Sequence, residues 1–210
     1  MKKLIGTLLA AVFTVTAVFA QTPEEILARM DRETARFDKE GFIMVMEVKI
    51  PILGTFATTA YFADDNYKMV LDVKGKKAYT WSDGVTEWMY DESRNELHIS
   101  SSKPSEETEA ESNSKMLKGI TKGYDVTLQK ETADAWYFLC TKSKTNQDKD
   151  DPKKMDLAVS KATYLPISLK TSVKGIGVTM RDFAVGVKAE DIAFNQADYA
   201  DATVIDKRGE

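Results

Sequence analysis

The residues of this sequence that could do chemistry are few and lack recognisable partners. The single histidine, His98, lies in the alternating segment Glu96–Ile99, faces away from Leu97 and Ile99, and is expected to be solvated. A general base needs an oriented partner within hydrogen-bond reach, and none can be named for it. The sequence has no nucleophile-elbow serine, no phosphate-binding glycine loop and no paired metal-ligand spacing. These observations predict a protein that is not an enzyme and that uses no cofactor or metal.

Two further sets of side chains have structural explanations. The one cysteine, Cys140, directly follows the apolar run 136–139, so it is predicted to be a small buried residue rather than a catalytic thiol. Asp148, Asp150 and Asp151 carry oxygens of the kind that bind calcium, but their loop lacks the glycine and terminal glutamate of a dedicated calcium loop. A solvated turn is the expected structure there.

The first twenty residues have the features of a secretory signal. Lys2 and Lys3 precede an apolar run from Leu4 to Phe19, and the small residues Val18 and Ala20 suit signal peptidase. The run is shorter than the roughly 20 apolar residues that span a bilayer. We therefore expect cleavage after Ala20, export to the periplasm, and a single mature domain, 21–210. With no cysteine near the cleavage site, a lipid anchor is not expected.

The charge and hydropathy of the remaining chain exclude two classes of protein. The formal net charge is −4 for the whole sequence and −6 without Lys2 and Lys3, and no basic block is present, which argues against nucleic-acid binding. No second apolar stretch approaches membrane-spanning length, so the mature protein is expected to be soluble. It is also expected to be a monomer.

Hydrophobic periodicity predicts one helix followed mainly by strands. Thr22 to Glu25 has the pattern of a capping box with proline at the first helical position, and apolar residues at helical spacing continue to about Phe37. Short turns between period-two segments favour sequential antiparallel pairing. Strands are predicted at 42–50, 55–62, 67–73, 77–81, 86–90, 96–100, 125–130, 135–141, 154–159, 165–173, 177–185 and, as a short C-terminal strand, 191–194, with a tail around 204–208. Between the two blocks, 104–119 is predicted to be a helix, with a solvated loop as the alternative.

The strands share one strongly apolar face that includes five methionines. Methionine is flexible and polarizable, and it suits surfaces that must fit varied apolar ligands. With two helices to cover a long sheet, the interior is either filled by its own side chains or left as an apolar cavity, and the pattern alone favours the filled core. The residues of this face are Phe42, Met44, Met46, Tyr67, Met69, Leu71, Met155, Leu157, Leu165, Ile167, Leu169, Val178 and Met180.

Two segments resemble the periplasmic outer-membrane lipoprotein carrier family, LolA. The hairpin 81–91 carries Ser82, Asp83 and Gly84 at the end of one strand, and Trp88 and Tyr90 in the next. Phe-Asn at 194–195, followed by 204–208, resembles the closing segment of that family. The signal peptide without a lipidation cysteine, the amphipathic first helix and the element order fit the family over essentially the whole mature chain.

The resemblance implies a mostly β fold, an unclosed antiparallel barrel of about eleven strands with an N-terminal helix and a second helix as a lid. It also implies a carrier that binds lipoprotein acyl chains in an apolar cavity. The implied partners are an ATP-driven release complex of the inner membrane and an acceptor of the outer membrane. The pattern alone favours a filled core, but the resemblance favours a cavity. The apolar face is then the candidate wall of that cavity.

One departure from the family limits the mechanism that can be carried over. Well-studied carriers have an arginine just after the second long strand that helps to hold the lid closed. The matching segment here, 61–66, contains no arginine. The alternative is therefore a lipid-binding or sensory envelope protein of the same fold, with another ligand or a protein partner.

The signal sequence gives the first prediction. The mature protein should begin at Gln21 and be released by osmotic shock, because the apolar run ends at a cleavage site before it is long enough to anchor the chain. Intact-mass measurement of the exported protein checks this. Retention of residues 1–20, or resistance of the protein to carbonate extraction, would contradict it.

Overall fold

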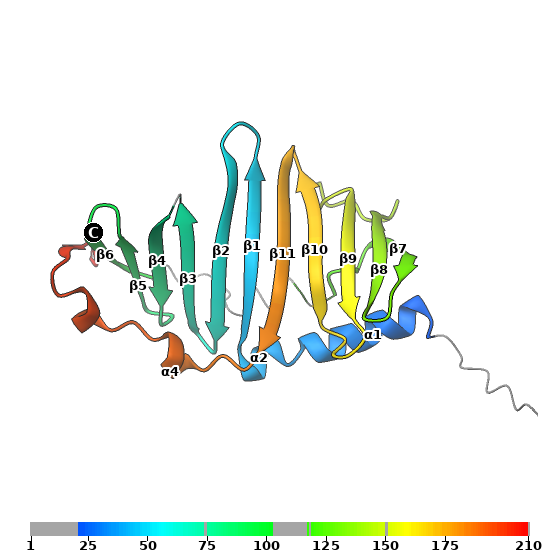
Figure 1. Ribbon diagram of the computed structural model, residues 1–210, viewed down its shortest axis with the longest axis horizontal. Coiled ribbons are helices and arrows are strands. Elements are labelled where there is room, and N and C mark those ends of the chain that lie inside the picture. The colour runs from blue at the N-terminus through cyan, green and yellow to red at the C-terminus, as the bar shows by residue number, and fades with distance from the viewer. Residues whose placement is uncertain (1–20, 74, 103–116, 118, 150, 210) are drawn as a thin grey trace, which may run out of the picture.

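The computed structural model describes residues 21–73, 75–102, 117, 119–149 and 151–209. Within this part of the chain a single sheet of twelve strands dominates, with short helices along one end of the strands (Figure 1). The predicted signal peptide and most of the predicted helix 104–119 lie outside the described residues. None of the described helices is long and apolar enough to cross a membrane.

Helix α1 (Pro23–Thr34) begins at the predicted capping box. The backbone N–H of Thr22 donates to the carboxylate of Glu25 over 3.0 Å, and the N–H of Glu25 donates to the Thr22 hydroxyl over 3.3 Å. Such a cap stabilises a helix by about 1 kcal/mol. The helix ends three residues before the predicted limit, and a single turn, α2 (Phe37–Glu40), follows it.

The strands pair almost entirely in the predicted sequential, antiparallel manner, so the expected mostly β, unclosed fold is confirmed. The sheet order is β12-β6-β5-β4-β3-β2-β1-β11-β10-β9-β8-β7, and β12 alone among these strands pairs in parallel, with β6. The bounds are β1 Phe42–Ile50, β2 Gly54–Ala63, β3 Asn66–Val73, β4 Lys76–Ser82, β5 Thr86–Asp91, β6 Glu96–Ser101, β7 Tyr124–Glu131, β8 Ala135–Lys142, β9 Lys154–Ser160, β10 Pro166–Val173, β11 Ile176–Val185 and β12 Thr203–Asp206.

The C-terminal segment differs from its prediction. The short strand predicted at 191–194 is wrong, because α4 (Ala189–Ile192) extends into it, and a 3₁₀ turn, η1 (Gln196–Tyr199), follows. Glu190 and Asp191 lie in the first turn of α4, where carboxylates meet the positive end of the helix dipole. The predicted tail instead contains β12, which completes the edge of the sheet beside β6.

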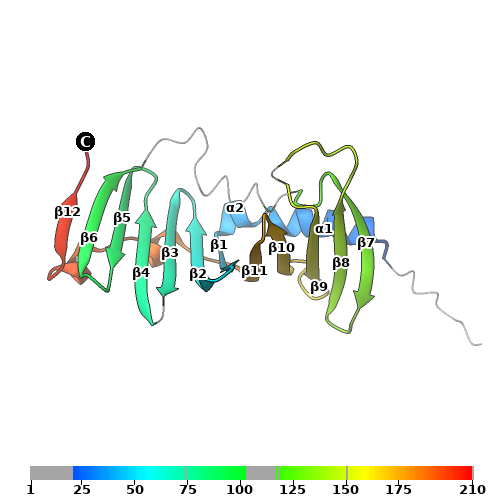
Figure 2. The same ribbon diagram turned by 90° about the horizontal axis from the view of Figure 1, so that it is seen from above.

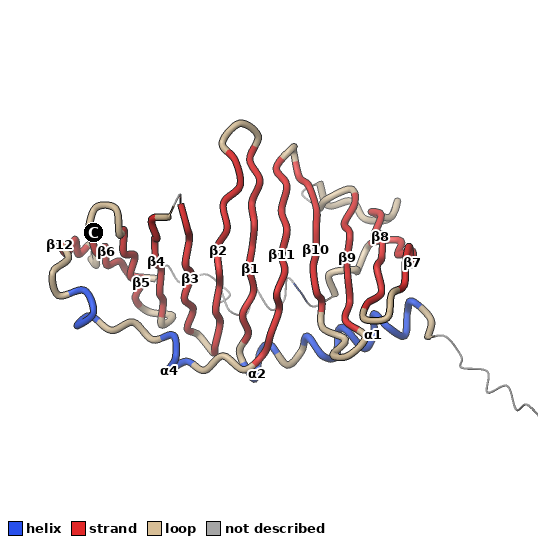
Figure 3. Tube along the Cα trace, viewed as in Figure 1, coloured by secondary structure: helices blue, strands red, loops and turns tan. Residues whose placement is uncertain are grey.

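The sheet is open, and its two edge strands, β12 and β7, lie far apart. Seen from above, the strands form one long row from β12 to β7, with α1 and α2 behind the strands of the centre and of the β7 end (Figure 2). Figure 3 shows that the described helices gather at the same end of the strands. The opposite end carries hairpin turns and none of the described helices.

Gly41, between α2 and β1, brings three segments into contact. Its φ is +63°, and a Cβ there would lie 2.2 Å from the carbonyl oxygen of Val187 and 2.7 Å from that of Phe62. The N–H of Gly186 donates to the Gly41 carbonyl over 3.1 Å. Any larger residue would therefore push the chain that follows β11 away from the start of β1.

Gly41→Ala should reduce the free energy of unfolding by about 3 kcal/mol or more, because a backbone clash adds to the strain of a positive φ. Gly175→Ala is the matched control, since its φ is +84° and nothing lies within 4 Å of the added Cβ. It should cost only about 1 kcal/mol. Urea denaturation of both variants measures the difference, and equal losses would contradict the close approach at Gly41.

Candidate functional site

The strand register assigns each side chain to one of two faces. Residues directly opposite each other in neighbouring strands point to the same side of a sheet. Met46 on β1 lies opposite Met180 on β11 and opposite Thr58 on β2. We call the face that carries Met46 the inner face and the other the outer face.

One row of paired residues shows how apolar the inner face is. It crosses nine strands, and Thr58 is its one polar member. From β7 to β4 the row reads Leu128, Phe138, Leu157, Leu169, Met180, Met46, Thr58, Leu71 and Ala78. Strand pairing thus brings apolar side chains that are distant in the sequence, such as Met46 and Met180, together on one face of the sheet.

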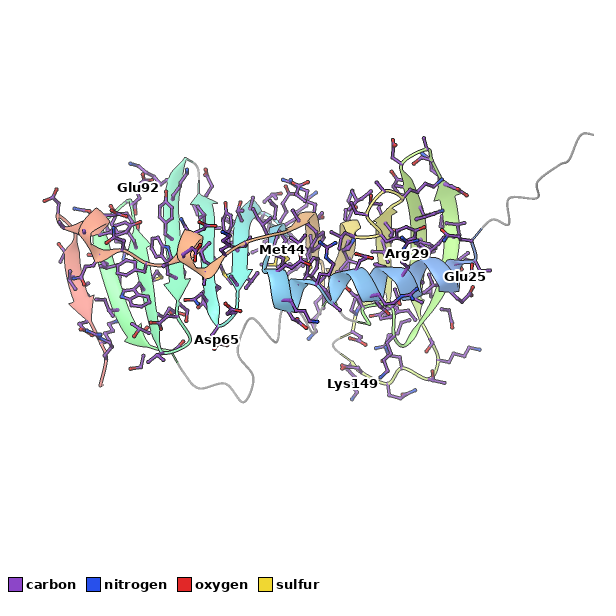
Figure 4. The ribbon with its side chains drawn as sticks, turned by 90° about the horizontal axis from the view of Figure 1, so that it is seen from below. Glu25, Arg29, Met44, Asp65, Glu92 and Lys149 are labelled. Carbon is purple, nitrogen blue, oxygen red and sulfur yellow. The ribbon has the colours of Figure 1, made fainter. Side chains whose placement is uncertain are left out.

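The helices cover the inner face at one end of the strands. Ile26, Leu27 and Met30 of α1 are buried in the same core cluster as the strand residues. The ring of Phe37 on α2 stacks on Phe42 with centroids 4.6 Å apart, and Phe42 stacks on Phe62 at 4.7 Å. In Figure 4, α1 lies across the sheet, with Met44 beside the helices. This end of the face is closed by the protein's own side chains.

Helix α1 is also held at its N-terminal end. The guanidinium of Arg29 lies 3.9 Å from the centre of the Tyr164 ring, and the Tyr164 hydroxyl donates to the Gln21 side chain over 2.8 Å. Such a cation–π contact contributes about 0.5–1 kcal/mol at a partly exposed site. These contacts fix helix α1 to the turn before β10. The arginine among them belongs to the helix itself, whereas segment 61–66 contains no arginine.

The other end of the inner face is incompletely covered. Met44 is only 2% exposed, whereas Met46, one pair further along β1, is partly buried. The same holds for further inner-face residues of β1 and of the neighbouring strands β2, β3 and β11. We call this surface the apolar strip; it consists of Met46, Val48, Phe56, Met69, Leu71 and Val178.

The predicted wall residues divide between the closed core and the apolar strip. Eight of them are buried in the closed core: Phe42, Met44, Tyr67, Met155, Leu157, Leu165, Leu169 and Met180. The strip takes Met46, Met69, Leu71 and Val178. Whether either group contacts a ligand remains a prediction.

Ile167 departs from the predicted register. The pairing shifts by one residue between Pro166, opposite Val159, and Ser168, opposite Ala158. An extra residue of this kind breaks the period-two alternation. Ile167 is consequently 41% exposed instead of buried with Leu165 and Leu169.

Beyond the apolar strip, the inner face becomes polar on β4 to β6. The Tyr67 hydroxyl donates to the Glu87 carboxylate over 2.6 Å, and the hydroxyls of Ser82 and Ser102 lie 3.2 Å apart. His98 is also on this face and is partly buried rather than solvated, with its Nε2 3.3 Å from the Glu96 carboxylate. An apolar ligand would therefore be bounded at this side.

The outer face of β4 to β6 carries a second apolar cluster that the sequence analysis did not predict. Trp81 packs edge-on against Phe194 and Tyr199, with centroids 5.4 Å apart in each pair, and Trp88 stacks on Phe194 at 4.8 Å. Burial there raises the pKa of Tyr199 to about 12. We call Tyr79, Trp81, Trp88, Tyr90, Phe194 and Tyr199 the outer cluster. The alternation of aromatics in β4 and β5 was the signal that could have indicated it.

The residues that carried the family resemblance have structural roles. The Asp83 carboxylate accepts from the N–H groups of Val85 and Thr86 over 2.9 and 2.7 Å. The Ser82 hydroxyl accepts from the N–H of Gly84, whose φ is +83°. They shape the β4–β5 turn, while Trp88 and Tyr90 belong to the outer cluster.

Cys140 and the aspartates of the loop before β9 are the remaining candidates for chemistry. Cys140 is buried as predicted, and burial raises its pKa to about 11, which keeps it a thiol at neutral pH. Asp151 accepts from the Asn146 side chain over 2.7 Å; Asp150 lies outside the described residues. No group of three or more His, Cys, Asp or Glu residues in the described chain is arranged to hold a metal ion.

Comparison with known proteins gives matches among solved structures. Neither the family models nor the curated proteins match the sequence. The similar solved structures include a LolA superfamily protein. That structure, from Nitrosomonas europaea, is 13% identical, with 85% of this chain and 100% of that chain covered and a TM-score of 0.35.

Two other solved structures are similar over most of this chain. An uncharacterized conserved protein from Thermus thermophilus is 16% identical, with coverages of 89% and 100% and a TM-score of 0.43. MucB in complex with MucA(peri) is 14% identical, with 88% of this chain and 62% of that chain covered and a TM-score of 0.43.

The outer cluster gives a stability prediction. Trp81→Ala should reduce the free energy of unfolding by about 3–5 kcal/mol, because Trp81 is buried between β4 and the C-terminal segment. Tyr137→Ala is the control, since Tyr137 is an exposed outer-face aromatic on β8 and should cost less than about 1 kcal/mol. Urea denaturation measures both, and a Trp81→Ala loss no larger than the control would contradict the role of the cluster.

Proposed function

We propose that this chain binds the acyl chains of lipids or lipoproteins on its apolar strip and carries them through the periplasm from the inner to the outer membrane. The observation that supports this is the strip itself, an apolar surface that the described helices leave partly uncovered. A soluble protein rarely leaves a contiguous apolar surface of this kind without an occupant.

The strip can supply enough energy to hold an acyl chain. Each methylene removed from water contributes roughly 0.8 kcal/mol, so ten give about 8 kcal/mol before the costs of association. The thioethers of Met46 and Met69 lie on adjacent inner-face rows and adapt to chains of different shape. Because the surface is partly open, a bound chain can leave without unfolding of the core.

The neighbouring residues would position the ligand without reacting with it. The closed core around Phe42 and Phe62 sets one limit for an acyl chain. The hydrogen-bonded pair Tyr67–Glu87 sets a polar limit toward β5. The open course for a long chain therefore runs along Met46 and Val178, toward the hairpin turns.

A carrier of this kind needs a donor and an acceptor. By the family resemblance, these are an ATP-driven lipoprotein release complex of the inner membrane and an outer-membrane acceptor. Purified protein that is folded but takes up no acyl chain would instead favour the sensory alternative, in which the same surface binds a protein.

Met46→Glu and Met69→Glu should each abolish uptake of a fluorescent fatty acid or a synthetic triacylated lipopeptide while the protein remains folded. A carboxylate in the strip repels an apolar chain, yet it can still reach water because both positions are partly exposed. Fluorescence titration and thermal unfolding of each variant provide the measurement.

Two control variants separate the strip from its surroundings. Val70→Glu changes a partly exposed outer-face residue beside Met69 and should leave uptake unchanged. Met44→Glu places a charge in the closed core and should unfold the domain, because the charge would be desolvated and unpaired. Normal uptake by folded Met46→Glu and Met69→Glu would overturn the proposed site.

A further inference from the structure

Exposed apolar side chains gather at the hairpin turns farthest from the helices. Ile52 is 104% exposed and Leu53 is 68% exposed, both in the β1–β2 turn. Val73 at the end of β3 and Ile176 at the start of β11 are exposed as well. Since β3, β2, β1, β11 and β10 are neighbours in antiparallel order, their turns lie along one edge of the sheet, and the β1–β2 hairpin reaches furthest (Figures 1 and 3).

The backbone at Ile52 makes this exposure more unusual. Its φ is +73°, a conformation that β-branched residues rarely adopt. Asparagine or glycine would fit this turn position with less strain and without exposing apolar surface. Folding of the turn therefore does not account for an isoleucine here.

The turn segments of this edge are mainly basic, although the chain as a whole is acidic. Neighbouring strands add two carboxylates: Glu92 accepts from the N–H of Lys77 over 2.8 Å, and Asp156 is paired with Lys170. The described residues of segments 49–55, 72–77 and 170–177 include five lysines and one carboxylate, against a net charge of −4 for the whole chain. That carboxylate, Asp72, accepts a hydrogen bond from the N–H of Gly75 within its own turn. The lysines are Lys49, Lys76, Lys77, Lys170 and Lys174.

We propose that this edge, the hairpin-turn edge, docks on the surface of an anionic phospholipid bilayer. Ile52 and Leu53 enter the interface, and the surrounding lysines lie near the lipid phosphates. Apolar side chains that protrude from convex turns within a basic surround suit a fluid anionic surface, which combines an apolar interior with negative charge. This inference goes beyond acyl-chain binding, because it concerns contact with the membrane itself and does not require cargo.

The position of the edge also matches the apolar strip. Val48 and Phe56 are the strip residues nearest the β1–β2 turn, one pair of strand positions from Ile50 and Gly54 at its base. A membrane at the hairpin-turn edge would therefore lie at the open end of the strip. Docking there places the strip beside the acyl chains of the bilayer.

Vesicle co-sedimentation with the full mature protein tests the proposal. The wild-type protein should bind vesicles of phosphatidylglycerol and phosphatidylcholine, and bind pure phosphatidylcholine vesicles at least about tenfold more weakly. Ile52→Asn should weaken binding to the anionic vesicles about tenfold, because it removes an inserted apolar side chain. Its melting temperature should be unchanged or higher, because asparagine tolerates the positive φ.

Val85→Asn is the matched control, since Val85 is 74% exposed in the β4–β5 turn at the opposite edge, and it should leave vesicle binding unchanged. Replacing Lys49 and Lys76 together with glutamine should weaken binding to the anionic vesicles and reduce its salt dependence. Met69→Glu should retain vesicle binding even where it abolishes acyl-chain uptake, which separates failure of this inference from failure of the proposed function.

Three results would overturn the proposal. The first is equal vesicle binding by the wild type and Ile52→Asn. The second is equal binding to neutral and anionic vesicles. The third is a wild-type protein that does not bind vesicles but forms a dimer, which is lost in Ile52→Asn. That result would assign the edge to contact with a second copy of the chain.

Discussion

The pairing of β1 with β11 is the contact on which the rest of the structure depends. It joins residues 42–49 to residues 177–185, so that the N-terminal meander and the C-terminal strands become one sheet. On the outer face, the guanidinium of Arg181 lies 2.7 Å from the Glu47 carboxylate. On the inner face, the same register places Met46 opposite Met180. Without this junction each half would have its own narrow apolar face, and the row that crosses nine strands would not exist.

A sheet this wide has more apolar surface than the helices of the described residues cover. Helices α1 and α2 close one end of the inner face, and the C-terminal segment closes part of the outer face through Phe194 and Tyr199. The apolar strip lies on the inner face beyond α1 and α2 and extends toward the hairpin-turn edge, where none of the described helices lies. The proposed acyl-chain site thus follows from a shortage of covering elements, and its polar limit at Tyr67 and Glu87 follows from the change of apolar face along the sheet.

Much of this arrangement could be predicted from local patterns. The bounds of β1 and the capping box at Thr22 were predicted correctly, because strict alternation and cap chemistry depend on neighbouring residues. Ile167 could not be placed, since a bulge depends on the partner strand. The strand prediction at 191–194 was wrong. Ile192 and Phe194 are apolar because they pack against distant parts of the chain, and not because they alternate in a strand. The lysines of the hairpin-turn edge are dispersed in the sequence, and the topology alone brings them together.

Mass spectrometry of the organic extract tests the central claim most directly. Protein purified from its native envelope without detergent should carry acyl-chain lipid or lipoprotein in near-stoichiometric amount, because the apolar strip would otherwise face water. The folded Met69→Glu variant, isolated in the same way, should carry none. Extracts of the wild type and the variant that contain equally little lipid, together with no uptake of a fatty acid by the wild type, would contradict the account.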